Sequence, residues 1–297
     1  MKTIQDQVKE VMKNIKGRAN QDAALIKIGL RPADIQLIRF AEAQERKAKR
    51  QGMRPVLRIG DLTFGVEIEC VNAPRINLLN AVESNGVGIA FEGYNHTDRK
   101  DRFKLVTDAS LTGRNPIECV SPVLKGKQGE SQLKKVCDAL AQVGATANKS
   151  CGLHVHIGAA KMTDKQYIRV FKNYQAIEGL IDAMMPLSRR GNCRWAKSLA
   201  WTSFIGCATK LEVQAAMGYD RYYKVNAMSY SRHKTIEFRQ HSGTVEFKKI
   251  QMWVHFLAAF VKFSMTSEQA PTTNIDDLAW LPTEVKDFYK ARIQQLA

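Results

Sequence analysis

Apolar and charged positions alternate from Phe64 to Glu69. Successive side chains of a β-strand point to opposite faces. Phe64, Val66 and Ile68 therefore share one face of a predicted strand, and Glu67 and Glu69 share the other. Such a strand would bury its apolar face and present two carboxylates on the opposite surface.

Two later segments repeat this alternation with other ionisable groups. One presents His154 and His156, and the other presents Glu237, Arg239 and His241. Groups of this kind gathered on neighbouring strands would repel one another or lack partners unless something lay between them. The pattern therefore predicts a polar face that surrounds a divalent metal ion and phosphate.

The remaining periodicity predicts an α+β fold with a largely antiparallel, curved sheet and flanking helices. Strands are expected at residues 56–69, 87–94, 102–107, 117–121, 153–157 and 225–241. The first could instead be a short hairpin turning at Gly60-Asp61, and the last could also be a hairpin. Helices are expected at residues 4–15, 34–50, 133–144, 164–181, 246–265 and 283–295, with mixed helix and loop at 188–220. Thr163 and Gln166 have the spacing of a capping box at the start of one helix.

The chain divides at the change from helical to strand patterning. We expect residues 1–55 to form a basic helical N-terminal extension and residues 56–297 to form a catalytic domain. The extension contains the basic run 46–50, which is either a solvated helix end or a docking surface for nucleic acid or another partner.

The composition of the 297 residues is that of a globular protein with a strong positive charge. A hydrophobic content of 44% is enough for a substantial core. The net charge of +16 implies attraction to polyanions, such as nucleic acid, nucleotide phosphates or acidic substrates. The six cysteines form no C-x-x-C pair, which fits a reducing compartment and argues against a cysteine-rich zinc module.

The apolar runs of the chain are short. The longest, near residues 252–260, cannot span a bilayer, which needs about 20 apolar residues. The first residues contain no apolar signal core. We therefore expect a cytoplasmic protein without a membrane partner.

The candidate site residues allow more than one interpretation. Glu67 and Glu69 could be the solvated side of a half-exposed strand. His154 and His156 point more strongly to a metal, because imidazole binds divalent ions well. Zinc is one alternative, although no third imidazole or thiolate stands at a suitable spacing. A nucleophilic pair of Cys151 with histidine is another, but Cys151 leads directly into a glycine and a strand, as a small packed residue would.

Arg239 lies two positions from Glu237 on the same predicted strand face. A guanidinium there needs an anion as a partner, and its planar fork suits a phosphoryl group. Carboxylates, imidazoles and an arginine on neighbouring strands together indicate metal-assisted phosphoryl transfer. The chain has no G-x-x-x-x-G-K-[ST] loop, so sheet residues would have to hold the nucleotide.

Five ordered motifs, within residues 60–250, carry a resemblance to a known family. They are Phe64-Gly65-Val66-Glu67-Ile68-Glu69, Asp108-Ala109-Ser110-Leu111, Glu118-Cys119-Val120-Ser121-Pro122, Cys151-Gly152-Leu153-His154-Val155-His156-Ile157 and Thr235-Ile236-Glu237-Phe238-Arg239-Gln240-His241-Ser242-Gly243-Thr244. The set resembles the amidoligases, a branch of the carboxylate-amine ligases that includes glutamine synthetase and glutamate-cysteine ligase. The stretch Glu92-Gly93-Tyr94-Asn95-His96 is similar to phage-encoded members, whereas Ala109 stands where many relatives have glycine.

The resemblance implies a glutamine-synthetase-like sheet that holds ATP and Mg²⁺ and joins a carboxylate to an amine through an acyl phosphate. It implies one ion held by Glu69 and Glu118, and another held by Glu67, His154 and Glu237. It further implies that His156 contacts the nucleotide phosphates, that Arg239 steadies the γ-phosphoryl group, and that Asp108 takes the proton of the amine. Arg221, like Arg189 and Arg190, is a further candidate for binding phosphate or the substrate carboxylate.

Other functions and features stay open at this stage. A metal-dependent hydrolase or phosphoesterase could use the same residues without ATP. A basic nucleic-acid-binding protein with a decayed ligase site would explain the charge. A ligase would exclude water with a lid, expected at residues 95–101 or 188–197, and it could assemble as a homo-oligomer.

Overall fold

The computed structural model describes residues 4–32, 35, 62–94 and 101–297. The chain divides into two compact units, residues 1–56 with 278–280 and residues 57–277 with 281–297. In the first unit, α1 (Ile4–Asn14) ends before Gly17, whose φ of 88° precedes α2 (Arg18–Lys27). Several predicted segments lie outside the described residues. They are most of the helix at 34–50 with its basic run, the start of the strand at 56–69, and residues 95–100 of the predicted lid.

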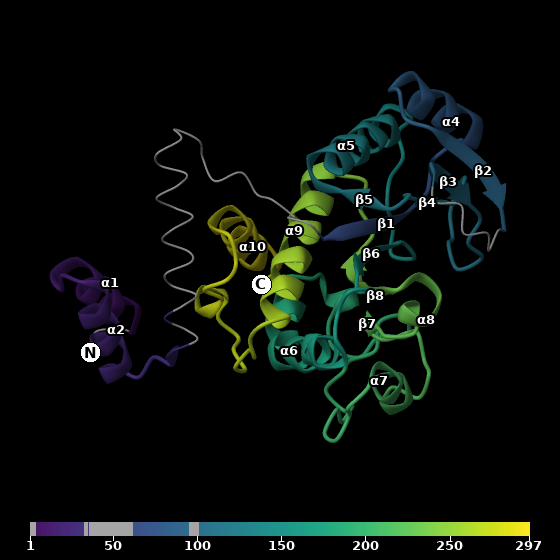
Figure 1. The fold of residues 1–297 in the computed structure, drawn as a ribbon. Coiled ribbons are helices and arrows are strands. Elements are labelled where there is room, and N and C mark those ends of the chain that lie inside the picture. The colour runs from purple at the N-terminus through teal and green to yellow at the C-terminus, as the bar shows by residue number, and fades with distance from the viewer. Residues whose placement is uncertain (1–3, 33–34, 36–61, 95–100) are drawn as a thin grey trace. The chain divides into compact units, whose positions relative to one another are not determined.

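The larger unit is built on a sheet whose described strands follow the order β2-β3-β4-β1-β6-β8-β7, with β5 paired to β1 (Figure 1). The strands are β1 (Thr63–Cys70), β2 (Ile89–Gly93), β3 (Phe103–Val106), β4 (Ile117–Val120), β5 (Leu124–Lys125), β6 (Gly152–Gly158), β7 (Val225–Asn226) and β8 (Thr235–Ser242). All their pairings are antiparallel except that of β2 with β3. The predicted α+β class with a largely antiparallel sheet is confirmed.

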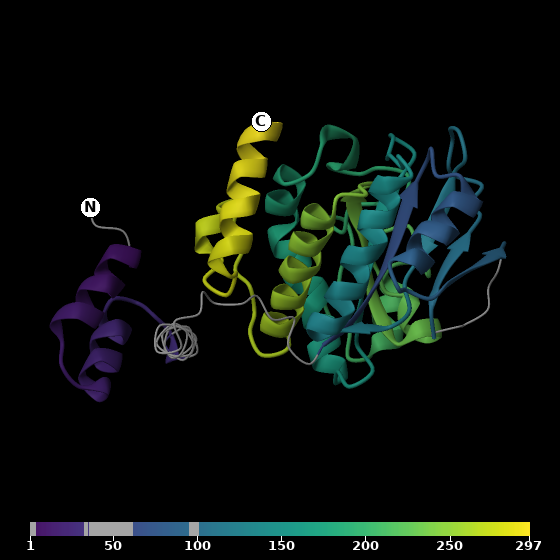
Figure 2. The same ribbon diagram turned by 90° about the horizontal axis from the view of Figure 1, so that it is seen from above.

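Helices pack against one face of this sheet and around its edges. The helices of the larger unit are α4 (Arg75–Ser84), α5 (Gly126–Gln142), α6 (Asp164–Ala183), α7 (Lys210–Ala216), α8 (Ser229–His233), α9 (Phe247–Ser264) and α10 (Thr283–Leu296), with 3-10 turns at Leu187–Arg189 and Ile275–Asp277. Figures 1 and 2 show α5 and α9 lying along the sheet, and α9 also packs against α6 and α10. Within the described residues, no helix is both long and apolar enough to cross a membrane.

The core lies between the sheet and these helices. Phe238 of β8 meets the rings of Tyr174 on α6 and Phe260 on α9, with ring centroids 5.9 and 6.3 Å away. Phe64 and Val66 of β1 are buried as the alternation predicts. The opposite side chains of the same strands therefore face away from the helices, where the ionisable groups were expected.

The structure confirms one predicted helix start and contains two helices, α4 and α8, that were not predicted. The capping box at Thr163 is confirmed, since its hydroxyl accepts from the backbone N–H of Gln166 and the Gln166 side chain accepts from the backbone N–H of Thr163. Of the strand or hairpin predicted at 225–241, the structure has the hairpin, since β7 and β8 pair antiparallel. The short helix α8 connects them, and Lys234, which follows it, has a φ of 57°. Residues 75–84 show little of the 3.6-residue hydrophobic periodicity that predicts a helix, so α4 was missed.

A buried cation fastens β7 to α6. Lys224 is fully buried, and its ammonium group lies 2.7 Å from Glu178 Oε1 and 2.6 Å from Asp182 Oδ1. Its carbonyl oxygen accepts a hydrogen bond from the backbone N–H of Arg239 at 2.8 Å. The ion pair therefore supports the backbone of β8 at the centre of the polar face.

Replacing Lys224 with methionine is expected to destabilise the protein by about 3–5 kcal/mol, because the buried Glu178 and the half-buried Asp182 lose their counterion. Chemical denaturation measures this change. Lys197→Met is the matched control, since Lys197 pairs with Asp220 at 2.6 Å on the surface and is worth at most about 1 kcal/mol. Equal losses in the two variants would contradict the role given to Lys224.

Candidate active site

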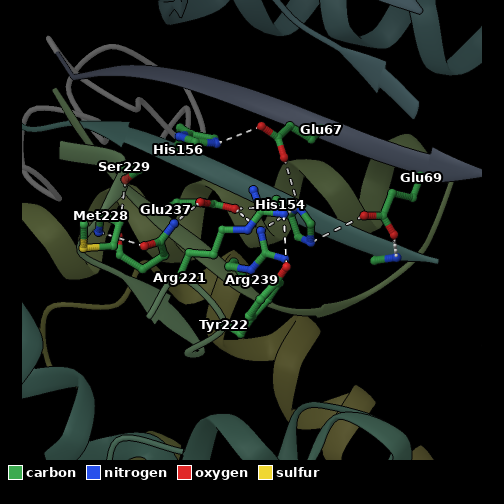
Figure 3. A network of polar contacts seen from close by, with 12 residues as sticks. Glu67, Glu69, His154, His156, Arg221, Tyr222, Met228, Ser229, Glu237 and Arg239 are labelled. Atoms are coloured by element: carbon green, nitrogen blue, oxygen red, sulfur yellow. Dashed lines mark hydrogen bonds and ion pairs between the residues drawn. The ribbon is translucent and has the colours of Figure 1, made fainter. Parts of the chain in front are cut away.

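Four neighbouring strands, β4, β1, β6 and β8, bring the predicted ionisable residues together. In antiparallel strands, directly opposed residues share a face and lie about 5 Å apart. The opposed pairs are Glu69 with Glu118, Glu67 with His154, and His156 with Glu237. Figure 3 shows these side chains, apart from Glu118, converging from their strands on one region.

Glu67 is held by both histidines. Its Oε2 lies 2.9 Å from His154 Nδ1, and its Oε1 lies 3.1 Å from His156 Nε2. Burial would raise the pKa of Glu67, but the hydrogen bonds and charges of the two histidines bring that pKa well below its ordinary value. The other nitrogen of His156, Nδ1, bonds the Thr235 hydroxyl at 2.9 Å. Burial lowers the pKa of His156, but the hydrogen bond to Glu67 and the charges of Glu67 and Glu237 together raise it above its ordinary value.

Glu237 and Arg239 form the second part of the site. Arg239 Nη1 lies 2.5 Å from Glu237 Oε1, and Asn226 Nδ2 donates to Glu237 Oε2 at 2.5 Å. Arg239 Nη1 is also 3.4 Å from His154 Nδ1. Burial raises the pKa of Glu237, whereas the charge of Arg239 lowers it below the ordinary value. The buried Nε of Arg239 has no hydrogen-bond partner among the described residues, and an anion could supply one.

Glu69 is fixed by the main chain of β6. Its Oε2 accepts a hydrogen bond from the backbone N–H of Gly152 at 2.5 Å, and its Oε1 lies 3.7 Å from His154 Nε2. A Cβ on Gly152 would lie 3.1 Å from His154 Nε2 and 3.4 Å from both Glu69 Oε2 and Arg189 Nη1. A side chain at position 152 would therefore crowd His154, and beside it the buried Arg189 donates a hydrogen bond to the Cys151 carbonyl oxygen at 2.6 Å.

A family model with the description "Putative amidoligase enzyme" matches residues 60–261, which is more than half of the chain. The chain belongs to the amidoligase family. No curated protein matches this amidoligase in a sequence search. The resemblance inferred from the five motifs is thus confirmed, and family membership makes amide-forming ligase activity the expected chemistry of the cluster.

The carboxylates of the amidoligase site crowd one another. Burial raises the pKa of Glu118 well above its ordinary value, and the charges of Glu67, Glu69 and Asp108 raise it further. Asp108, which follows β3, is thus one of the charges that act on Glu118. Asp108 also accepts a hydrogen bond from the backbone N–H of Ser110 at 2.7 Å. The carboxylates of the site therefore repel one another, and the histidines and arginines offset this repulsion only in part.

Glu118→Gln is expected to stabilise the metal-free amidoligase at neutral pH. A raised pKa means that folded Glu118 keeps a proton that the unfolded chain loses above pH 4.5, so stability falls as the pH rises through this window. Glutamine removes that loss, and the advantage of the variant should vanish below the ordinary pKa. Denaturation in a chelator at about pH 4 and pH 7.5 tests this, with Glu83→Gln on the exposed face of α4 as control. A difference independent of pH would contradict the role of ionisation.

Arg221 lies at the edge of the cluster. Its guanidinium carbon is 5.0 Å from the ring centroid of Tyr222, and that ring is 5.8 Å from the guanidinium carbon of Arg239. Figure 3 shows the side chains of Arg221 and Tyr222 beside Arg239. Arg190, in contrast, donates to the backbone oxygens of Met185 and Leu296 at 2.7 and 2.9 Å, so the structure gives it a supporting contact away from the carboxylates.

His241 does not belong to the polar face, contrary to the sequence alternation. The pairing of β6 with β8 shifts between Leu153 and Val155, so one extra residue of β8 turns His241 to the side of Leu153. The His241 ring lies 5.5 Å from the ring of Trp253 on α9. Burial lowers the pKa of His241 to about 3, which keeps it neutral.

The alternative of a cysteine nucleophile loses support. Cys151 is buried, and burial raises the pKa of its thiol. A raised pKa leaves little of the reactive thiolate at neutral pH. The structure therefore favours Cys151 as a packed side chain.

Two groups of side chains could hold divalent ions. Glu67, Glu118 and His154 form one, and Glu67, His156 and Glu237 form the other, with ligand atoms in each group within 4.8 Å of one another. Oxygen ligands with an imidazole suit Mg²⁺ or Mn²⁺, and the crowded carboxylates would be relieved by a cation. The residues present thus fit a metal centre that shares Glu67, whereas the family analogy had divided the ligands differently.

The predicted lid at 188–197 is anchored to α6 in this structure. The backbone N–H of Gly191 donates to Asp182 Oδ2 at 2.8 Å. Just beyond the segment, the backbone N–H of Leu199 donates to Glu178 Oε2 at 2.8 Å. That residues 188–197 close over a substrate stays a prediction.

Proposed function

We propose that this amidoligase is an ATP-dependent carboxylate-amine ligase that forms ADP and phosphate and uses Mg²⁺. The observation that carries the proposal is the buried Arg239, whose Nε has no hydrogen-bond partner in the part of the chain that the structure describes and which lies among several carboxylates. This arrangement suits a phosphoryl group bridged to the protein by cations and by Arg239. Membership of the amidoligase family supports the amide-forming outcome.

The proposed reaction has two displacements. An oxygen of the substrate carboxylate attacks the γ-phosphorus of ATP, and the bond to the β–γ bridging oxygen breaks, so ADP leaves. The amine nitrogen then attacks the acyl carbon of the resulting acyl phosphate, loses a proton, and expels phosphate. The products are an amide, ADP and phosphate.

The residues of the cluster would divide the work between them. Arg239 would bind the phosphoryl group through its guanidinium, with His156 contacting the same phosphates and Arg221 binding at the edge. Asp108 would accept the proton from the amine. Mg²⁺, held by Glu67, Glu69, Glu118, His154 and Glu237, would neutralise phosphate charge when bound.

A screen for ADP release tests the proposed function. Purified protein with ATP and Mg²⁺ is incubated with pairs of candidate carboxylates and amines, and we expect ADP only when both partners are present. Hydrolysis of substrates without ATP would favour the metal-dependent hydrolase or phosphoesterase. Absence of ATP binding under every metal condition would reject the ligase.

A further inference from the structure

Aromatic rings and guanidinium groups form a continuous row that ends at the active site. The guanidinium carbon of Arg194 lies 4.5 Å from the ring centroid of Trp195, and the rings of Trp195 and Tyr222 are 5.2 Å apart. The Tyr222 ring in turn lies 5.0 Å from the guanidinium carbon of Arg221 and 5.8 Å from that of Arg239. We call these five residues the aromatic-arginine row.

The outer part of the row is accessible and carries uncompensated charge. Arg194 and Arg221 are exposed, and Trp195 is 38% exposed. Among the described residues, no acidic side chain forms an ion pair with either arginine. The neighbouring Lys197 differs, because it is paired with Asp220 at 2.6 Å. Two cations packed on rings are thus available to an anionic ligand.

We propose that the aromatic-arginine row binds a single-stranded nucleic acid, which carries one of the two groups that the ligase joins. This proposal names the substrate class and rests on the proposed function for its catalytic part alone. Aromatic faces and guanidinium planes both stack nucleobases, and guanidinium groups bind phosphates. The row offers these two chemistries in alternation, and its inner end, Arg239, contacts Glu237 and His154 of the cluster.

The charge of the chain favours a strand over smaller or less aromatic ligands. A net charge of +16 far exceeds what one triphosphate requires. An acidic peptide would use the arginines but would leave the exposed indole of Trp195 without a stacking partner. A strand uses both, because each nucleotide brings a base and a phosphate.

Fluorescence anisotropy with labelled oligothymidylate of about 12 nucleotides tests the proposal on the full chain. Trp195→Ala is expected to weaken binding about tenfold, whereas Trp195→Phe keeps most of the affinity because a ring remains. Arg194→Ala should weaken binding more than Lys248→Ala, which removes the same charge from a surface ion pair with Glu284. Unchanged thermal melting confirms that the variants fold, and ultraviolet crosslinks should map to peptides containing Trp195 or Tyr222.

Three results would overturn the proposal. Strand affinity that is unchanged in both Trp195→Ala and Arg194→Ala, with crosslinks in residues 1–56, would place binding on the basic extension. A parallel loss of ATP affinity in Trp195→Ala would assign the row to the base of free ATP. If polyglutamate displaced the oligothymidylate equally well from the wild type and from Trp195→Ala, the row would bind negative charge alone. Strand binding that depends on Trp195, in a protein that binds no ATP under any metal condition, would uphold the row and reject the ligase instead.

Discussion

Replacing Glu67 with glutamine is expected to lower the rate of amide formation by about a thousandfold while the protein stays folded. Glu67 is the one side chain common to both groups that could hold a metal ion. It also bonds both histidines, at 2.9 and 3.1 Å. Glutamine keeps the shape of the side chain but removes the negative charge that would bind a cation.

The stability of this variant follows from its neighbours. Loss of the Glu67 charge removes repulsion against Glu118, since Glu67 is one of the charges that raise the pKa of Glu118. It also removes an anion that favours the protonated form of His156. Because the two histidines hold the pKa of Glu67 well below its ordinary value, the Glu67 charge stabilises the fold at neutral pH, so we expect the variant to stay folded with a lower free energy of unfolding.

Two measurements separate catalysis from folding in Glu67→Gln. ADP release measures the rate, and calorimetric titration with Mg²⁺ or Mn²⁺ measures metal affinity, which should fall along with the rate. Glu83→Gln makes the same chemical change on the exposed face of α4 and should leave both unchanged. Full activity in Glu67→Gln would show that Glu67 is not a ligand of the metal centre.

The alternation of strand residues was sufficient to predict most of the cluster. A period of two depends only on backbone geometry, so Glu67, Glu69, His154 and Glu237 could be assigned to one face without knowledge of the fold. The sheet order then decides whether the faces coincide. Because β1 lies between β4 and β6, and β6 pairs with β8, they do. The five motifs implied a glutamine-synthetase-like sheet through the family resemblance, but the sequence predicted no strand order.

Residues were misplaced or missed where a strand departs from its period of two, or where the hydrogen-bond partner lies far away in the sequence. The irregular pairing of β6 with β8 turns His241 to the helices, and no residue type in β8 announces such an irregularity. Asn226, which bonds Glu237, and Lys224, which pairs with Glu178, are ordinary polar residues in the sequence. Their roles depend on contacts across 11 and 46 positions. Gly152 could have been noticed in the sequence, because it directly precedes the segment that carries His154 and His156.

The arginine of the site should affect both folding and catalysis. Arg239→Ala is expected to destabilise the protein by about 3–5 kcal/mol, because Glu237 stays buried without its cation. The same change should lower the rate about a thousandfold or more, as loss of an arginine that binds a transferring phosphoryl group does. Arg239→Lys keeps the charge but loses the planar fork, so its stability should recover more than its rate.

A double variant separates the two effects of Arg239. In Arg239→Ala with Glu237→Gln, the unpaired buried carboxylate is gone, so the free energy of unfolding should return toward that of the wild type. The rate of ADP release should stay low, because no guanidinium is left to bind the phosphoryl group. Denaturant unfolding and ADP release on the same preparations measure both quantities. Recovery of the rate together with the stability would show that Arg239 acts only as the partner of Glu237.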